Sequence, residues 1–565
     1  MKRKLNSFLA ILAVVILCCG VWCMTAFAEE SGVIQYRWMP AEGGDILGTE
    51  TFGSFEEGWN AAMEKRAEGY MVDVTLLADW RAVDGKFAET DGVGFRNHAL
   101  YIGAGPLLTL DLNEFTLDRG LSAQKNISGE ILFVDENTEV RIKNGNITGS
   151  WGKSAIVLYK ANTTIEYVNV YGNSVTDGKG AAIYAEGGSL ELNYCEFYEN
   201  SAEGTGESYG TVFLNAVSKV ALSGCVFKEN TNFAYGSGLC LEACEDVTID
   251  RCVFEKLQAT KNGGALWLHA IPKVLITYCE FQECSANDGG AIYGESVADG
   301  AVEDSAFEKN QAANNGGALY MRSWQGYLGT CMLTENKAAK DGGALYLDAA
   351  ESGNKEMSFV GGNFMKNTAG GNGGSVYVKG SVSSKYTLNI TTATLKGGAA
   401  GENGGGIYLE AHNTLTLWNG AEIAGNTAKG NGGGVYAEAD TETAMHDKVT
   451  VRHNQGANGV ANNFYVVLPG TITFSNFTCE NDSVGISHPG ERGIFATVLG
   501  EFNREAVFCD DDGWSIQNTN RIGGTFQLRL ERETGNTFVI IIVAVALVAL
   551  GTFVIPMFKK KKKAV

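Results

Sequence analysis

Gly289-Gly-Ala-Ile-Tyr293, Gly316-Gly-Ala-Leu-Tyr320 and Gly342-Gly-Ala-Leu-Tyr346 are successive copies of the phrase that decides the fold of this chain. The phrase occurs ten times between residues 180 and 436, in more or less degenerate form, at a mean spacing of 28 residues. A fixed period of this length is typical of solenoids, in which each repeat buries its apolar face only against its neighbours. We therefore expect a stacked-repeat protein.

Two further apolar runs occur within each period. One is a phrase of the type Cys225-Val-Phe227-Lys-Glu-Asn230, and the other is an alternation such as Val274-Leu-Ile276. All three runs alternate with period two and none has helical spacing, which indicates three short strands per repeat. A propeller blade needs a longer period, and a leucine-rich repeat does not carry Gly-Gly-Ala-Leu-Tyr in half of its unit. The pattern predicts an all-β, right-handed parallel β-helix with about 28 residues per coil.

The sequence divides into six segments. A basic start, an apolar run and the small residues of Ala26-Phe-Ala28 predict a secretory signal, and an uncharged run before five lysines predicts a membrane span with a cytoplasmic tail. The expected segments are a signal peptide at 1–28, an N-terminal cap with an amphipathic helix at 29–100, the β-helix at 101–465, a β-rich cap and membrane-proximal segment at 466–536, a transmembrane helix at 537–558 and a basic tail at 559–565. The predicted location is the cell membrane, single-pass, with the large N-terminal region extracellular.

Both ends of the chain allow a second interpretation. The leader could remain as an uncleaved anchor. Glu531-Arg-Glu-Thr534-Gly535 lies where a sortase sorting signal would lie, but it lacks the Leu and Pro of such a signal. Attachment to a cell wall is therefore the alternative to a permanent span.

The recurring aromatic residue predicts an outer ladder. The preceding residue is aliphatic in every copy and must face the core, so strand alternation turns the aromatic outward. The ladder comprises Tyr184, Phe213, Trp267, Tyr293, Tyr320, Tyr346, Tyr377, Tyr408 and Tyr436. These rings either shield the sheet and one another or hold sugar rings or the apolar side chains of a partner. In the second case, replacing Tyr293, Tyr320 and Tyr346 with Ser would abolish ligand capture and leave the melting temperature nearly unchanged.

Two polar columns follow the same period. Asn200, Asn230, Asn310, Asn336 and Asn367 are expected to hydrogen-bond along the axis as an amide ladder. An Asn or Asp also precedes each Gly-Gly, and we interpret these residues as corner chemistry. Calcium would need six or more oxygens converging on one point, so neither column predicts a metal site.

The cysteines repeat as well. One inward position carries Cys195, Cys225, Cys252, Cys279 and Cys331, which should stack as small apolar residues. Parallel side-chain vectors disfavour disulfides between them. Cys479 and Cys509 are the favoured disulfide pair.

Charge and composition limit the chemistry. Removing the eight basic residues of the leader and tail from a formal net charge of −21 leaves −29, which disfavours nucleic acid as a partner. The histidines have no ligand spacing, and the carboxylate run Asp510-Asp-Asp512 is interpreted as a solvated loop. We expect no catalytic residue, metal or cofactor, and a glycan or another cell-surface protein as partner.

The alternation of Gly289-Gly-Ala-Ile292 with Phe307-Glu-Lys-Asn310 resembles the polymorphic outer-membrane protein repeats of bacterial surface adhesins, within the pectate-lyase-like β-helix class. The similarity covers roughly residues 100–470, and the carboxyl end departs from that family because it has no alternating barrel strands. The resemblance implies a surface-anchored, non-catalytic adhesin or interaction protein. The alternative is a membrane-tethered polysaccharide lyase or glycoside hydrolase of the same fold class.

Overall fold

The computed structural model describes residues 32–532, except 123–126, 177, 205, 351–352, 489, 491–492 and 520–524. The expected signal peptide (1–28), transmembrane helix (537–558) and basic tail (559–565) lie outside the described residues. Among the described residues, no helix combines the length and apolarity needed to cross a membrane.

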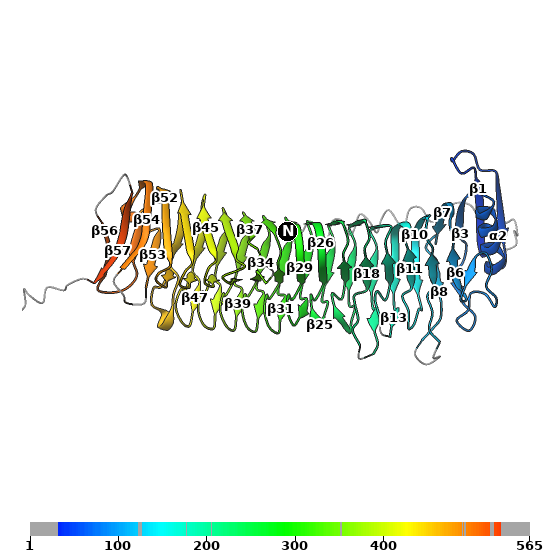
Figure 1. Cartoon of the computed structure of the whole chain (residues 1–565). Helices are drawn as coiled ribbons and strands as arrows, with labels where there is room; N and C mark the ends of the chain where they lie inside the picture. Colours follow the sequence, from blue (N-terminus) through cyan, green and yellow to red (C-terminus); the bar gives the residue numbers. More distant parts are fainter. Residues whose placement is uncertain are drawn as a thin grey trace, which may run out of the picture.

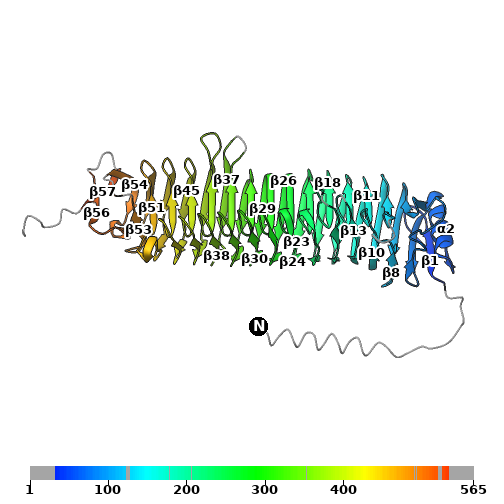
Figure 2. The same ribbon diagram turned by 90° about the horizontal axis from the view of Figure 1, so that it is seen from below.

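The chain forms one long rod of about 14 stacked coils (Figure 1). Helix α2 (Phe55–Ala67) lies at one end, and the strands β56 (Trp514–Asn518) and β57 (Phe526–Arg532) lie at the other. The view turned by 90° shows the same stack from below, with a loop that projects near β37 (Lys355–Val360) (Figure 2). The long apolar period therefore produces an elongated solenoid.

Each coil contributes three main strands, and every strand pairs in parallel with its counterpart one coil away. Leu319 is opposite Leu345 in the first strand, and Phe307 is opposite Leu333 in the third. This stacking of residues one period apart confirms the β-helix. The coils also extend beyond the expected bounds, from β3 to β55 in place of 101–465, because parallel pairing already joins β3 to β7 and still joins β53 to β55.

The first strands carry the recurring aromatic residue. They are β6 (Ala99–Ile102), β9 (Leu132–Val134), β11 (Ile156–Tyr159), β14 (Ile183–Glu186), β18 (Val212–Asn215), β22 (Leu239–Glu242), β26 (Leu266–Thr277), β29 (Ile292–Glu303), β32 (Leu319–Arg322), β36 (Leu345–Asp348), β40 (Val376–Lys379), β44 (Ile407–Leu409), β48 (Val435–Ala437) and β51 (Phe464–Val466). Strands β26 and β29 continue without a break into the second strand of their coils.

The second strands form the next face of the rod. They are β3 (Met71–Leu76), β7 (Gly105–Asp111), β10 (Thr138–Thr148), β12 (Asn162–Tyr171), β15 (Ser189–Asn193), β19 (Lys219–Ser223), β23 (Asp246–Asp250), β33 (Gly326–Gly329), β37 (Lys355–Val360), β41 (Tyr386–Thr391), β45 (Thr414–Trp418), β49 (Glu442–His446), β52 (Thr471–Phe477) and β54 (Gly493–Phe502).

The third strands carry the central Phe of the second phrase. They are β4 (Trp80–Arg81), β8 (Thr116–Asp118), the ends of β10 and β12, β16 (Glu196–Tyr198), β20 (Val226–Lys228), β24 (Val253–Glu255), β27 (Glu280–Gln282), β30 (Ala306–Glu308), β34 (Met332–Thr334), β38 (Asn363–Met365), β42 (Thr394–Lys396), β46 (Ala421–Ala424), β50 (Val449–Arg452), β53 (Val484–Ser487) and β55 (Val507–Cys509).

A fourth, very short strand completes many coils. Six such strands form a separate parallel sheet: β28 (Ser285–Ala286), β31 (Gln311–Ala312), β35 (Lys337–Ala338), β39 (Thr368–Ala369), β43 (Ala399–Ala400) and β47 (Thr427–Ala428). Shorter pairs join β13 (Ser174–Val175) to β17 (Ser201–Ala202) and β21 (Phe233–Tyr235) to β25 (Ala259–Asn262). The expectation of three strands per coil missed this element because two residues are too few to show an alternation.

The core is a stack of equivalent side chains. Leu319, Leu345 and Val376 are fully buried, as strand alternation predicts. The third strands stack the rings of Phe227, Phe254, Phe281 and Phe307 with centroids 4.7–5.0 Å apart. Burial of these apolar columns stabilises each coil only through its two neighbours.

Antiparallel strands close both ends of the rod, and a helix adds to the cap at the amino end. At the amino end β1 (Ile34–Met39) pairs with β2 (Gly48–Phe52) and β3, and α2 (Phe55–Ala67) begins after Ser54, whose Oγ accepts from the backbone N–H of Glu57. At the carboxyl end β57 (Phe526–Arg532) runs antiparallel to β54 and to β56 (Trp514–Asn518). These caps cover strand edges that would otherwise leave backbone groups unpaired.

Candidate functional site

The predicted aromatic ladder forms a continuous ring stack over part of its length. From Tyr293 to Tyr465 each ring is stacked on the next, with centroids 4.8–5.3 Å apart. Tyr184 and Phe213 form a shorter stack, and Cys240 occupies the equivalent position between Phe213 and Trp267. The column lies outside the aliphatic core, as alternation predicts, because the neighbouring Leu and Val side chains are fully buried.

The expectation that this ladder is exposed is wrong for five of its members. Phe213 is fully buried, and Tyr293, Tyr346, Tyr377 and Tyr408 expose only 6–8% of their surface. Tyr184, Trp267, Tyr320 and Tyr436 are half-buried. Each ring from Tyr320 to Tyr436 presents its faces to the rings above and below, so only an edge points outward. A sugar ring packs on an aromatic face, and that face is already occupied here.

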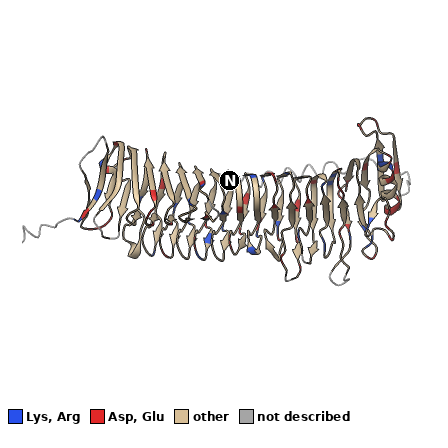
Figure 3. Cartoon of the chain, viewed as in Figure 1, with Lys and Arg blue, Asp and Glu red and all other residues tan. Residues whose placement is uncertain are grey.

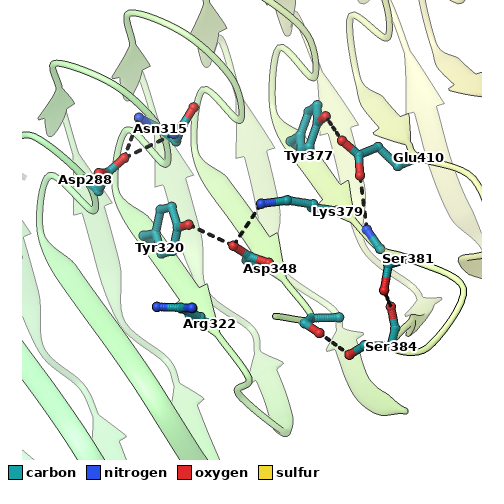
Figure 4. Close-up of polar contacts among 12 residues, drawn as sticks. Asp288, Asn315, Tyr320, Arg322, Asp348, Tyr377, Lys379, Ser381, Ser384 and Glu410 are labelled. Carbon is teal, nitrogen blue, oxygen red and sulfur yellow. Dashed lines mark hydrogen bonds and ion pairs between the residues drawn. The ribbon is translucent and has the colours of Figure 1, made fainter. Parts of the chain in front are cut away.

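A charged column lies beside the tyrosine column. It occupies the position two residues after each tyrosine of the ladder and was not anticipated from the sequence. In Figure 4, Asp348 accepts from the hydroxyl of Tyr320 at 3.1 Å and forms an ion pair with Lys379 at 3.3 Å. One coil further, Glu410 accepts from the hydroxyl of Tyr377, and its second oxygen accepts from the backbone N–H of Gly380 at 3.2 Å.

Burial changes the proton affinity of this face. It raises the pKa of Tyr184 to about 12, with the hydrogen bond to Glu186 acting in the same direction. Burial likewise raises the pKa of Tyr320 and Tyr377 well above that of a free tyrosine. The carboxyl of Glu410 also has a raised pKa, because burial outweighs its hydrogen bonds from Tyr377 and Gly380. The face is therefore a built polar network, not a bare aromatic platform.

Both Asn columns hold the coils together. Asn200, Asn230, Asn310, Asn336 and Asn367 are fully buried, and the predicted hydrogen bonds along the axis are present. The corner column is a second ladder: the N–H of Asn315 donates to Asp288 at 3.0 Å (Figure 4). The left-handed backbone at the corner falls on the glycine that follows, with φ of +63° at Gly289. At each corner the glycine makes the turn, and the amide or carboxylate side chain before it links one coil to the next.

The repeated cysteines are buried as expected, but the expected disulfide at the carboxyl end is not formed. Cys195, Cys225, Cys252, Cys279 and Cys331 are buried and form no disulfide, as predicted. Cys240, Cys244 and Cys284 are buried too, Cys240 at the position of the recurring aromatic and the other two outside the repeated cysteine position. The expected disulfide between Cys479 and Cys509 is absent, because the Cys479 sulfur packs against the backbone of Asp447 and Val449 while Cys509 lies at the end of β55.

An open groove near the amino end offers a second candidate surface. Its volume is about 520 Å³, and it is lined by Asn113, Glu114, Asn144, Gly145, Asn146, Tyr167 and Asn169. Hydrogen bonds fix several of the amides: Asn169 donates to Asn146 at 3.0 Å, and Asn144 donates to Asp111 at 3.1 Å. The groove therefore presents oriented amide groups.

Exposed tyrosines border this groove. Tyr167 and Tyr194 are 58% and 56% exposed, and their rings stack with centroids 5.2 Å apart. A Cβ at Gly224 would lie 2.7 Å from the Tyr194 ring, so that ring lies over the glycine of the next coil. One face of Tyr167 is covered by Tyr194, and Tyr167 also lines the groove.

These tyrosines were not singled out from the sequence. Tyr167 and Tyr194 occupy a turn with left-handed backbone, with φ of +56° and +53°. Tyr278 occupies the same turn position three coils after Tyr194 and is 55% exposed. A large side chain at positive φ is uncommon and costs free energy, so a recurring aromatic there is the signal that could have been noticed.

Comparison with known proteins agrees with the architecture. Residues 154–338 match the family model of the right-handed β-helix region. No curated protein matches the chain. The matched segment lies inside a stack of parallel coils that continues on both sides of it, and the chain is therefore a β-helix protein.

Proposed function

We propose that this chain is a cell-surface-anchored, non-catalytic β-helical adhesin or interaction protein whose ligand is a glycan. The binding site in this proposal is the groove and its tyrosine border. The observation that carries the proposal is Tyr167, which is 58% exposed and lines a groove beside four asparagines. An aromatic face packs on the apolar side of a sugar ring, and amides and a carboxylate hydrogen-bond to its hydroxyls.

The sequence resemblance to surface adhesins favours the same proposal. A stiff rod would hold this groove away from a cell surface, if the predicted signal peptide and membrane span operate as the sequence suggests. The groove is lined by residues of β10 and β12, which lie toward the amino end of the rod, whereas β56 and β57 lie at the opposite end (Figure 1). Figure 3 shows acidic and basic residues mixed along the rod, and the overall excess is acidic. A neutral glycan suits such a surface better than an anionic polymer.

Glycan-array binding followed by titration tests the site. Tyr167→Asn removes the ring but tolerates the left-handed backbone, so it should fold. We expect its affinity for the captured glycan to fall several-fold to about tenfold, the loss of one ring contact. Tyr278→Asn is the matched control at the same turn position outside the groove and should bind normally. Equal binding by both variants, or capture of a cell-surface protein alone, would contradict the glycan site.

The predicted location has its own test. A chain ending at residue 536 should appear in the medium, whereas the full-length chain should remain with the membrane and lose its rod to external protease. Release of the full-length chain from walls by muralytic enzyme, with no membrane fraction, would favour the wall-attached alternative.

A membrane-tethered polysaccharide lyase or glycoside hydrolase is the second candidate. β-Helix families include enzymes and non-enzymes. The observation in its favour is the face of Figure 4, where Glu410 with its raised pKa lies in the same charged column as Asp348 and Lys379. A hydrolase needs two carboxylates, one of which holds a proton near neutral pH. Reducing or unsaturated ends that accumulate with the wild type and not with Glu410→Gln would establish this candidate over the first.

A further inference from the structure

Two parallel strands end side by side near the carboxyl cap. Strands β53 and β55 pair with Ile486 opposite Cys509. His488 and Asp511 each follow that pair by two residues, so the same register brings them together. The backbone N–H of His488 donates to the Asp511 carboxylate at 3.1 Å, which fixes the two turns against each other.

Three potential ligand atoms converge at this point. A nitrogen of His488, the sulfur of Cys509 and a carboxylate oxygen of Asp511 all lie within 4.8 Å of one another. Nε2 of His488 is 3.7 Å from Oδ2 of Asp511, which is too long for a hydrogen bond. Separations of this size are those between ligands that share a metal ion, since each would lie about 2.0–2.3 Å from a central zinc.

The side chain of the histidine is buried beside Trp514. The side chain of His488 has no solvent exposure, and the ring packs edge-on against Trp514 with centroids 4.4 Å apart. Within the part of the chain that the structure describes, Nε2 of His488 has no hydrogen-bond partner. A buried polar atom without a partner calls for an explanation, and an ion at this point supplies one.

We propose that His488, Cys509 and Asp511 form a zinc site that joins the last parallel strands of the rod. Thiolate, imidazole and carboxylate are the donors that zinc takes in tetrahedral sites. Three protein ligands leave the fourth position to solvent. The site binds the end of β53 to the end of β55, directly before the chain enters the closing hairpin of β56 and β57.

Asp510, the residue before Asp511, forms hydrogen bonds within the cap. Asp510 accepts from the backbone N–H of Asn463 at 2.7 Å, from its side-chain amide at 2.8 Å and from the hydroxyl of Ser487 at 3.0 Å. The expectation of a solvated acidic loop is thus wrong for Asp510, which extends the Asn ladder into the cap. Its hydrogen bonds hold the turn that presents Asp511.

Zinc binding has a consequence for the histidine ring. Nδ1 of His488 accepts from the backbone N–H of Gly490 at 2.9 Å, so the proton of the neutral ring is on Nε2. When Nε2 binds zinc, the proton moves to Nδ1, and the Gly490 contact must open. The Cys509 thiol releases its proton when it binds, so zinc binding is predicted to release one proton and to weaken as the pH falls.

Cobalt substitution of the intact purified chain tests the site. We expect one equivalent of Co²⁺ to give visible bands of tetrahedral cobalt and a near-ultraviolet thiolate charge-transfer band, and Zn²⁺ to displace both. Cys509→Ser should lose the charge-transfer band and His488→Ala should bind at least tenfold more weakly. Cys479→Ser and His446→Ala are matched controls, a nearby cysteine and an adjacent-coil histidine outside the cluster, and should behave as wild type.

A thermal readout separates binding from folding. Zn²⁺ should raise the melting temperature of the wild type and of both controls, and leave that of Cys509→Ser and His488→Ala unchanged. Cobalt bound without a thiolate band, or a thermal shift that survives both variants, would overturn the proposal and assign the metal to surface carboxylates.

Discussion

Oδ1 of Asn367 accepts two hydrogen bonds from Asn336 in the preceding coil, one from its backbone N–H at 3.0 Å and one from its side-chain amide at 3.1 Å. Asn367 in turn donates to the carbonyl of Leu333 at 2.9 Å. Both side chains are fully buried, so each amide satisfies backbone groups at a corner where no strand pairing is available. The ladder substitutes for a sheet at the point where the coil turns.

Asn367→Ala is predicted to destabilise the rod by about 3 kcal/mol, because it leaves two donors of Asn336 and the carbonyl of Leu333 buried without partners. Chemical denaturation monitored by circular dichroism measures the loss. Asn363→Ala is the matched control, since Asn363 is exposed in the adjoining β38 and should change stability by less than about 0.5 kcal/mol. Equal stability of the two variants would show that the ladder contributes little.

Tyr346→Ser is predicted to lower stability by about 3 kcal/mol, since Tyr346 is 7% exposed and its ring is stacked 4.8 Å from both Tyr320 and Tyr377. The sequence alone predicts the opposite result, a nearly unchanged melting temperature, because it treats the ladder as an exposed ligand-binding surface. The melting temperature and glycan capture of Tyr346→Ser and Tyr167→Asn should therefore diverge: the first loses stability, and the second loses binding. An unchanged melt for Tyr346→Ser would restore the exposed-ladder interpretation.

Alkaline pH is predicted to weaken the rod through the tyrosine column. The pKa of an unfolded tyrosine is about 10, and burial raises the pKa of Tyr320, Tyr377 and Tyr408 above it. The folded state keeps these protons to higher pH, so their contribution is complete below about pH 10 and is lost as the pH rises through the folded values. Denaturation at several pH values between about 9 and 12 gives the slope, and Tyr377→Phe should reduce it. A slope unaltered in that variant would mean that other groups control alkaline unfolding.

The sequence predicted the fold better than the site, for a physical reason. Leu319, Phe307 and their equivalents in the other coils lie at positions that period-two alternation marks as buried. The solenoid and its inward columns therefore follow directly from the sequence. Alternation says which way Tyr346 points but not how far its neighbours cover it. That depends on ring stacking between coils and on the turn that packs beside it, both of which are tertiary. The exposure of the ladder was therefore mispredicted.

The groove and the proposed zinc site were not predicted, for related reasons. Tyr167 lies at a left-handed bend within β12, where no periodic pattern marks it. His488 and Cys509 are 21 positions apart, which matches no metal-ligand spacing along the chain. Only the register of β53 with β55 brings them together. Sites that form by contacts between coils cannot be recognised from the spacing of residues along the chain, even where that spacing predicts the coils themselves.

The cysteines give a prediction that tests several contacts at once. Alkylation requires the thiolate, and burial raises the pKa of Cys244 to about 11 and that of Cys284 to about 12. The native chain should therefore react with iodoacetamide first at Cys509, which is partly exposed, and very slowly at the buried cysteines. After denaturation without reductant, all ten cysteines of the described chain should be labelled, as counted by mass spectrometry. A count of eight, with Cys479 and Cys509 unlabelled until reductant is added, would show instead that the carboxyl cap is closed by a disulfide and would leave no thiolate for the zinc site.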